Sequence, residues 1–284
     1  MEKNRKKTGI DLRAPSGWGE LTAEQTVTVA GLLGEGLSSA EELALLCFFR
    51  FTGVSFYRRN MTNYELRQRQ KTGLRTDFSG LYRYKKYIVE IDDDTIFAFA
   101  EKLKFLADVP GLMACQNTIA GLHFSDSELW QTTFEEYCMA DRYYRAYSKM
   151  KDENHLCAMI AALYRNKKEA YRDELVEKNT KRILRKSQPE QRQAVFLWWT
   201  GLKVWIREKY PDLFSGGKNT VEFGNTESDD DDSESIMNML YSITEGKAHE
   251  NRQVFKTSVH EVLHALNTKA KNINEMNSKF KKNN

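Results

Sequence analysis

Apolar residues recur at helical spacing through most of the chain. The clearest case is residues 153–164, where Leu156, Met159, Ile160 and Leu163 follow i, i+3, i+4, i+7 spacing. Positions with this spacing return to one face of a helix every 3.6 residues. The pattern therefore predicts an amphipathic helix that buries one face.

Capping residues mark where further helices begin. Thr22 followed by Gln25 fits a capping box, Thr132 or Thr133 precedes two glutamates, and Pro189 suits a first helical position. Together with the apolar spacing, these signals predict helices over about residues 22–33, 39–52, 93–108, 133–148, 168–186, 189–210, 235–243 and 250–276. The scarcity of proline, with four in the chain, agrees with a helical fold.

One stretch has the two-residue period of a strand instead. From Tyr82 to Ile91, aromatic and charged residues alternate and then give way to β-branched ones. This stretch is expected to pair with Ile10 to Arg13 or to fold on itself. The fold class predicted is thus mainly α, a bundle-like core of several helices with a small β-hairpin and a C-terminal helical appendage.

The composition changes after Phe214 and suggests where the domains end. A polar stretch there leads into an acidic run from Glu227 to Glu234. Such a segment buries too little apolar surface to offset its ordering entropy, so it is expected to be a flexible linker. The division predicted is a basic tail (1–7), a helical core (8–214), an acidic linker (215–234) and a C-terminal helical appendage (235–284).

Charge and apolar content constrain the location and the partners. The net charge of +3 on 284 residues is small and does not by itself favour nucleic acid. No window approaches the roughly 20 apolar residues of a membrane span, and the basic N-terminus lacks the apolar region of a signal peptide. A cytoplasmic protein without membrane contact is expected.

The four cysteines agree with that location. They are widely spaced, and none forms a C-x-x-C pair. Most of them lie among apolar residues, so buried free thiols in a reducing compartment are expected. The cysteines are Cys47, Cys115, Cys138 and Cys157.

A cationic segment between residues 54 and 80 raises the question of nucleic acid. Its charged residues, interleaved with tyrosines, are Arg58, Arg59, Arg67, Arg69, Lys71 and Arg75. Phosphate contacts use such residues, but a solvated helix or loop explains them more simply. Nucleic-acid binding is kept as a third hypothesis for function.

The most specific chemical motif is H-E-x-x-H at residues 260–264. On a helix, His260 and His264 are one turn apart and can hold a zinc ion, while Glu261 can act as general base of a metallopeptidase. The motif lies inside a predicted helix, as this chemistry requires. It is the one pattern in the chain that points to catalysis.

Its surroundings favour a structural explanation. Catalytic zinc needs a third protein ligand, and after His264 only Glu275 is available, within the same predicted helix. The apolar stripe of that helix leaves both histidines off its centre, as half-exposed residues of an ordinary amphipathic helix. We therefore expect no catalytic residue, no metal and no cofactor, with zinc on His260 and His264 as the alternative.

Tryptophans cluster in the helix that follows Pro189. Trp198, Trp199 and Trp205 lie within eight residues and could form a stacking platform for a ligand. At helical spacing, core packing is the simpler explanation, because indoles bury the largest area per residue. These residues are assigned to the core.

Several segments in order resemble poorly characterised helical proteins of phages and prophages of gut bacteria. They are Trp18-x-Glu20-Leu21-Thr22-x-x-Gln25, residues 133–144, the Leu163-Tyr164-Arg165 helix, the Tyr210-Pro211-x-Leu213-Phe214 stop and the helix from Val259 to Lys271. Proteins of that kind tend to be encoded in structural or tail-assembly modules. These proteins have no defined catalytic residues that the resemblance could assign to this chain.

The function expected is a non-enzymatic interaction protein of phage-type assembly. Its partners would be other proteins, namely phage structural or assembly components, engaged by the C-terminal appendage or the cationic segment. Helix-in-groove binding is the expected mechanism, with the acidic linker supplying reach. The runner-up function is a zinc metallopeptidase that uses residues 260–264.

Overall fold

The computed structural model describes residues 12–35, 39–59, 80–124, 126–167, 169–214, 244 and 247–282. These residues are mainly helical and include a small antiparallel sheet, which confirms the predicted fold class. The chain forms two compact units. The N-terminal unit comprises residues 1–21 and 31–108, and the C-terminal unit comprises residues 22–30 and 109–284.

The helices of the N-terminal region begin and end where the sequence indicated. A short 3₁₀ helix η1 (Trp18–Glu20) precedes α1 (Ala23–Gly34), and α2 covers Ala40–Thr52. Ser39 caps α2 by accepting a hydrogen bond from the Glu42 amide at 3.1 Å. Gly53 ends it with φ of +66°, a left-handed conformation that glycine adopts without steric cost.

A three-stranded antiparallel sheet follows, with β2 (Gly80–Tyr84) between β1 (Val54–Arg59) and β3 (Tyr87–Ile91). The predicted strand over Tyr82 to Ile91 folds on itself as β2 and β3, which confirms one of the two expected pairings. The third strand, β1, was not predicted. The side chain of Tyr82 is fully buried in this sheet and packs on Phe56 at 4.6 Å between ring centroids.

The core of the N-terminal unit lies between α2 and the next helix. Asp92 caps α4 (Asp93–Lys102) by accepting from the Thr95 amide at 2.7 Å, and α4 continues as the 3₁₀ helix η2 (Leu103–Ala107). The Thr95 side chain lowers the pKa of Asp92 most, and this amide hydrogen bond lowers it further. Phe48 of α2 meets Phe99 of α4 edge to face, with centroids 5.1 Å apart. Asp92 is therefore a helix cap.

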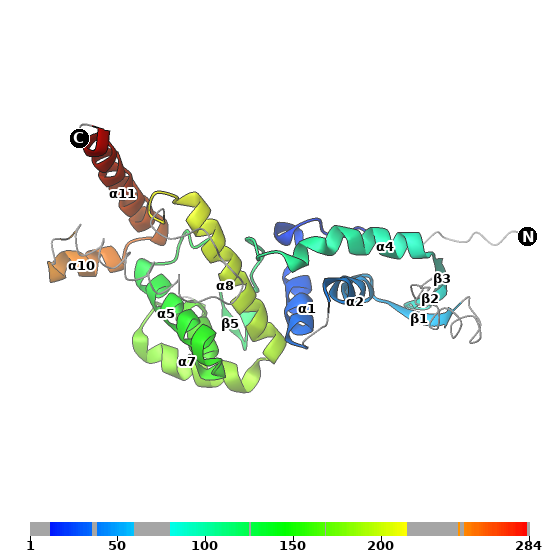
Figure 1. Ribbon diagram of the computed structural model, residues 1–284. Coiled ribbons are helices and arrows are strands. Elements are labelled where there is room, and N and C mark those ends of the chain that lie inside the picture. Colours follow the sequence, from blue (N-terminus) through cyan, green and yellow to red (C-terminus); the bar gives the residue numbers. More distant parts are fainter. Residues whose placement is uncertain are drawn as a thin grey trace, which may run out of the picture. The chain divides into compact units, whose positions relative to one another are not determined.

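Four helices make the body of the C-terminal unit: α5 (Phe134–Met150), α6 (Glu153–Leu163), α7 (Asp173–Lys186) and α8 (Pro189–Lys209). A two-stranded ribbon, β4 (Thr118–Ile119) with β5 (Leu122–His123), lies in the same unit. Helix α6 packs on α5, α7 and α8, and every residue from Leu156 to Leu163 is buried. Helix α6 therefore supplies much of the core of this unit, whose helices α5, α7 and α8 are labelled in Figure 1.

The caps of α5 and α8 explain two of the predicted boundaries. Thr133 and Glu136 form a reciprocal capping box at the start of α5. Pro189 occupies the first turn of α8, as the sequence predicted. Trp198 and Trp199 are fully buried, which confirms their assignment to the core, whereas Trp205 is half-buried.

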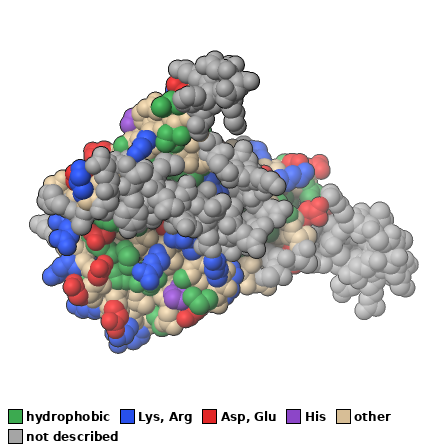
Figure 2. All heavy atoms as spheres, turned by 60° about the vertical axis from the view of Figure 1, so that its left-hand side comes forward, with side chains coloured by type: hydrophobic (Ala, Val, Ile, Leu, Met, Phe, Trp, Pro, Cys, Tyr) green, Lys and Arg blue, Asp and Glu red, His purple; other side chains and the backbone are tan. Residues whose placement is uncertain are grey.

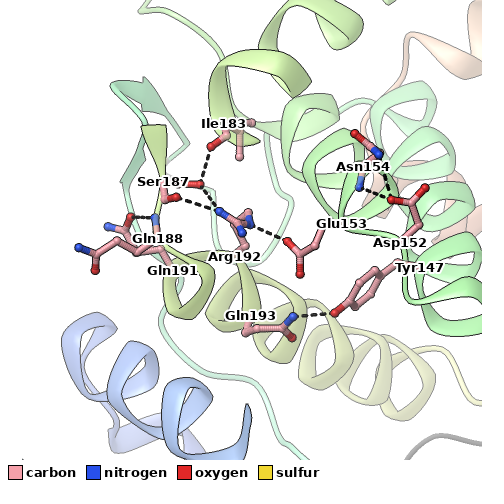
Figure 3. Close-up of polar contacts among 10 residues, drawn as sticks. All are labelled: Tyr147, Asp152, Glu153, Asn154, Ile183, Ser187, Gln188, Gln191, Arg192 and Gln193. Carbon is pink, nitrogen blue, oxygen red and sulfur yellow. Dashed lines mark hydrogen bonds and ion pairs between the residues drawn. The ribbon is translucent and has the colours of Figure 1, made fainter. Parts of the chain in front are cut away.

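A buried arginine joins α6 to the turn between α7 and α8 (Figure 3). Arg192 of α8 donates from Nε to Glu153 Oε2 at 2.7 Å and from Nη1 to the Ser187 carbonyl at 2.8 Å. Ser187 in turn donates to the Ile183 carbonyl at 2.7 Å. One guanidinium on α8 thus satisfies groups at the ends of two other helices, α6 and α7.

We expect Arg192→Ala to lower the free energy of unfolding by about 2 kcal/mol, because it leaves Glu153 and the Ser187 carbonyl without this partner. The expected loss of stability is modest because the side chain of Glu153 is 38% exposed, so solvent screens its ion pair with Arg192. Urea unfolding followed by circular dichroism measures it. The control is Lys181→Ala, which breaks an exposed pair with Glu177 and should leave the midpoint unchanged. Equal losses in the two variants would contradict the assigned role.

The C-terminal segment forms two helices, α10 (Ala248–Phe255) and α11 (Val259–Lys282). The prediction of one helix over residues 250–276 is therefore wrong at residues 256–258. The Phe134 amide donates to the Thr257 carbonyl at 2.8 Å, and the Val259 amide donates to the Thr132 carbonyl at 3.0 Å. These strand-like hydrogen bonds with the start of α5 take the place of the helical hydrogen bonds that a continuous helix would have made across residues 256–258.

The predicted division of the chain differs from the two compact units. Residues 8–214 span both units, and residues 248–282 belong to the same unit as α5 to α8. The basic tail (1–7), the acidic linker and the predicted helix over 235–243 lie outside the described residues. Their assignments remain predictions.

The described helices were also compared with the requirements of a membrane span. None of them is both long enough and apolar enough to cross a bilayer. The cytoplasmic location remains an expectation.

Candidate functional site

The H-E-x-x-H motif lies at the beginning of α11, where the helix meets the body of the C-terminal unit. Residues 257–259 are held by the start of α5, and the loop of residues 126–133 runs beside them, with Ser258 donating to the Trp130 carbonyl at 3.2 Å. His260 is the second residue of α11. Its position is therefore fixed from two sides.

Both ring nitrogens of His260 have hydrogen-bond partners inside the protein. Nδ1 lies 2.6 Å from the Tyr210 hydroxyl, and Nε2 lies 2.6 Å from the Glu128 carbonyl oxygen. A carbonyl oxygen only accepts, so Nε2 carries the hydrogen and Nδ1 of the neutral ring accepts from the hydroxyl. The assignment follows from the partners and fixes one neutral tautomer.

The imidazole is also enclosed by aromatic rings. It lies against Trp130, with centroids 4.1 Å apart, and meets Trp205 edge-on at 5.7 Å. The residue is 5% exposed. Burial is the main cause that lowers the pKa of His260, and the charge of Lys209 acts in the same direction, so the neutral form is favoured.

The burial of His260 corrects one expectation from the sequence. The helical wheel placed both histidines at the half-exposed edge of the apolar stripe, and this is wrong for His260. The loop of residues 126–133 covers that edge, which a wheel of one helix does not show. His264 is exposed, and so is Glu261.

This geometry does not suit a zinc ion on the motif. A zinc ligand needs a free ring nitrogen, and each nitrogen of His260 already has a protein partner at 2.6 Å. Across the described residues, no group of three or more His, Cys, Asp or Glu side chains could hold a metal. His260 instead has the contacts of a structural residue that docks α11. The absence of a metal and of catalysis at Glu261 remains a prediction.

The loop that covers His260 is held by one carboxylate. Asp126 accepts from the Trp130 amide at 2.7 Å, from the Gln131 amide at 2.6 Å and from the Thr132 hydroxyl at 2.8 Å. The buried Leu129 has φ of +62°, an unusual conformation for a residue with a side chain. Three hydrogen bonds to one side chain hold this strained turn in place.

Trp130, which the sequence analysis did not single out, is the most exposed aromatic residue of this region. Its indole is 54% exposed, and its Nε1 donates to Glu128 Oε2 at 2.9 Å. Lys209 of α8 places its ammonium 4.0 Å from the Trp130 ring centroid and 4.3 Å from that of Trp205. The spacing of Asp126 and Trp130 was the available signal, since aspartate often caps a turn of this length.

The structure describes only part of the predicted cationic segment. Of the cationic segment, Arg58 and Arg59 belong to β1, while Arg67, Arg69, Lys71 and Arg75 lie outside the described residues. On the face drawn in Figure 2, basic and acidic side chains are interspersed. That face does not point to nucleic acid.

The cysteines are free thiols in the structure, as expected. Burial raises the pKa of Cys47 and of Cys115 to about 12 and that of Cys157 to about 11. Because the thiolate is the nucleophilic form, these residues are suited to the core and not to catalysis.

Comparison of the chain with protein-family models, with curated proteins and with solved structures finds no match.

Proposed function

We propose that this chain is a non-enzymatic interaction protein of phage-type assembly that inserts the second half of α11 into an apolar groove of a partner protein. The observation that carries the proposal is the exposure of this half-helix. All residues from Lys271 to Met276 are exposed, including two large apolar side chains, Ile273 at 44% and Met276 at 56%. The end of α11 points away from α5, α7 and α8 (Figure 1).

The exposed residues continue a stripe that is buried in the first half of the helix. Leu263 and Leu266 are fully buried against the C-terminal unit, and Ala270 is 5% exposed. Ile273 follows Ala270 by three positions and Leu266 by seven, so it lies on the same face. The apolar face therefore extends past the edge of the body.

Helix α11 is held on the C-terminal unit by several contacts, which favours binding. In addition to the two hydrogen bonds of His260, the Asn267 side chain accepts from the Leu213 amide at 3.0 Å. A helix that is already formed and held loses little conformational entropy when it binds. The second half of α11 is thus a preorganised ligand for a groove.

Charge indicates the kind of groove. Between residues 269 and 282 the chain carries five lysines and one glutamate. A second copy of this helix would bring like charges together, which opposes self-association. An acidic groove with apolar pockets fits both the charge and the two exposed apolar side chains, as in other helix-in-groove complexes.

We expect the double variant Ile273→Asp with Met276→Asp to weaken binding to the partner about 100-fold, because each apolar anchor contributes about 1–1.5 kcal/mol. The partner is sought among the proteins encoded beside this chain, by co-elution and then calorimetry with the full-length protein. The control is Leu184→Asp, which changes a side chain of similar exposure, 42%, on α7. It should bind as the wild type does.

Two results would contradict the proposal. One is a partner that binds the double variant and the wild type equally. The other is the failure of every neighbouring gene product to bind the wild-type chain. Circular dichroism of both variants should match the wild type, because solvent-exposed substitutions change stability little.

A further inference from the structure

We propose that Trp130 and Trp205 form a binding site for an organic cation of the quaternary ammonium class, and that the Lys209 side chain is its built-in occupant. The proposal is independent of the partner assigned to α11. It rests on a positively charged group that the structure already places between two indole rings.

The geometry is that of a cation–π site. The Lys209 ammonium lies 4.0 Å and 4.3 Å from the two ring centroids, well inside the distance of about 6 Å over which such contacts act. The His260 ring contacts both indoles and keeps them apart at a fixed spacing. His260 is itself held by Tyr210 and Glu128, so the spacing is set by the fold.

Two nearby carboxylates favour a cation against the cost of desolvation. Desolvation lowers the pKa of Lys209 and of His260, whereas Glu128 acts in the opposite direction on Lys209, and Asp126 and Glu128 do so on His260. Both carboxylates have structural duties in the 126–133 loop, since they hold the Trp130 backbone and indole. The two carboxylates therefore favour a cation between the indoles at a distance, and neither of them forms an ion pair with it.

Lys209 is a weakly held occupant. Among the described residues, its ammonium has no hydrogen-bond acceptor and no carboxylate within ion-pair distance, and desolvation lowers its pKa. A quaternary ammonium group carries the same charge, has no N–H donors to satisfy and is less strongly hydrated. It loses less on entering an aromatic site than a primary ammonium does.

Access to the site comes from solvent. The Trp130 side chain is 54% exposed, and Lys209 and Trp205 are half-buried. The flexible lysine side chain, on the last residue of α8, can leave while the backbone stays in place. Binding is then a competition between the external cation and Lys209.

The experiment is calorimetric titration of the full-length protein with choline chloride, using sodium chloride for ionic strength and 3,3-dimethyl-1-butanol as the neutral analogue of the same shape. Choline should bind the wild type saturably but weakly. Lys209→Ala should bind it at least about tenfold more tightly, because an intramolecular competitor has been removed. Lys209→Arg retains a cation between the indoles and should bind as weakly as the wild type.

Further titrations locate the site and the source of the cation. Trp205→Ala should abolish binding in both the wild-type and the Lys209→Ala backgrounds. A peptide that carries trimethyl-lysine is titrated beside free choline to tell whether the cation belongs to a protein or to a small molecule. Saturable binding of either ligand supports the site. The wild-type titration decides the question even if Lys209→Ala fails to fold.

The proposal is overturned by three results. They are the absence of saturable binding to the wild type, equal affinity for choline and the neutral alcohol, and binding that survives Trp205→Ala. Each of them would mean that Lys209 only packs against the two indoles as part of the fold.

Discussion

Replacing His260 with alanine is expected to lower the free energy of unfolding by about 3 kcal/mol, and replacing His264 by less than about 0.5 kcal/mol. The first substitution removes a buried ring and leaves the Tyr210 hydroxyl and the Glu128 carbonyl without their partners. The second removes an exposed side chain. The two histidines of one motif thus differ in energetic role.

Urea unfolding of the two variants measures this difference, and amide hydrogen exchange locates it. Protection should fall in the first turns of α11 in His260→Ala and stay unchanged in His264→Ala. Equal effects of the two substitutions would contradict the assignment of His260 as the residue that docks α11.

The advantage of the wild type over His260→Ala should also depend on pH. Burial lowers the pKa of His260 below its ordinary value near 6.5, so the unfolded chain binds a proton more readily. The stabilisation is then fully present above pH 6.5 and decreases as the pH falls through the lowered pKa. The difference in unfolding free energy between the wild type and His260→Ala should therefore become smaller as the pH is lowered.

Gly201→Ala is expected to destabilise the C-terminal unit by about 3 kcal/mol, against the helix propensity that favours alanine by about 1 kcal/mol. A Cβ atom at this position of α8 would lie 2.0 Å from the Gly111 carbonyl oxygen. That atom belongs to the backbone, so the helix and the segment of Gly111 would have to move apart. The steric cost therefore exceeds the gain in propensity.

The matched control is Gly34→Ala at the end of α1, where a Cβ atom would meet nothing within 4 Å. This variant should be as stable as the wild type or slightly more stable. Thermal unfolding by circular dichroism compares the two. An unchanged melting temperature for Gly201→Ala would contradict the close contact of α8 with Gly111.

The sequence was informative wherever structure depends on neighbouring residues. Thr133, one of the two capping residues predicted for α5, caps that helix, because a cap is a contact within three residues. The hairpin of β2 and β3 was predicted for the same reason. The core assignment of Trp198 and Trp199 followed from apolar periodicity.

Contacts between distant segments were not predictable in this way. Strand β1 has no clear two-residue alternation of apolar and polar positions, and it is defined by its pairing with β2. The break between α10 and α11 depends on hydrogen bonds with Thr132, whose carbonyl accepts, and Phe134, whose amide donates, more than 120 residues earlier. The burial of His260 depends on Glu128 and Trp130 in the same remote loop.

The sequence therefore revealed the histidine motif of the candidate site but not the residues around it. The motif at residues 260–264 stood out because its spacing has a known chemical use. Its structural role became apparent only with the partners of each ring nitrogen. The aromatic pair of Trp130 and Trp205 joins residues 75 positions apart and has no local signature.

We expect the histidine motif to dock α11 on the body and not to hold zinc. The measurement is the zinc content of the purified full-length protein after equilibration with one equivalent of zinc and removal of the unbound metal. Far less than one equivalent is expected, in the wild type and in His264→Ala alike. Stoichiometric zinc in the wild type that is lost in His264→Ala would contradict this expectation.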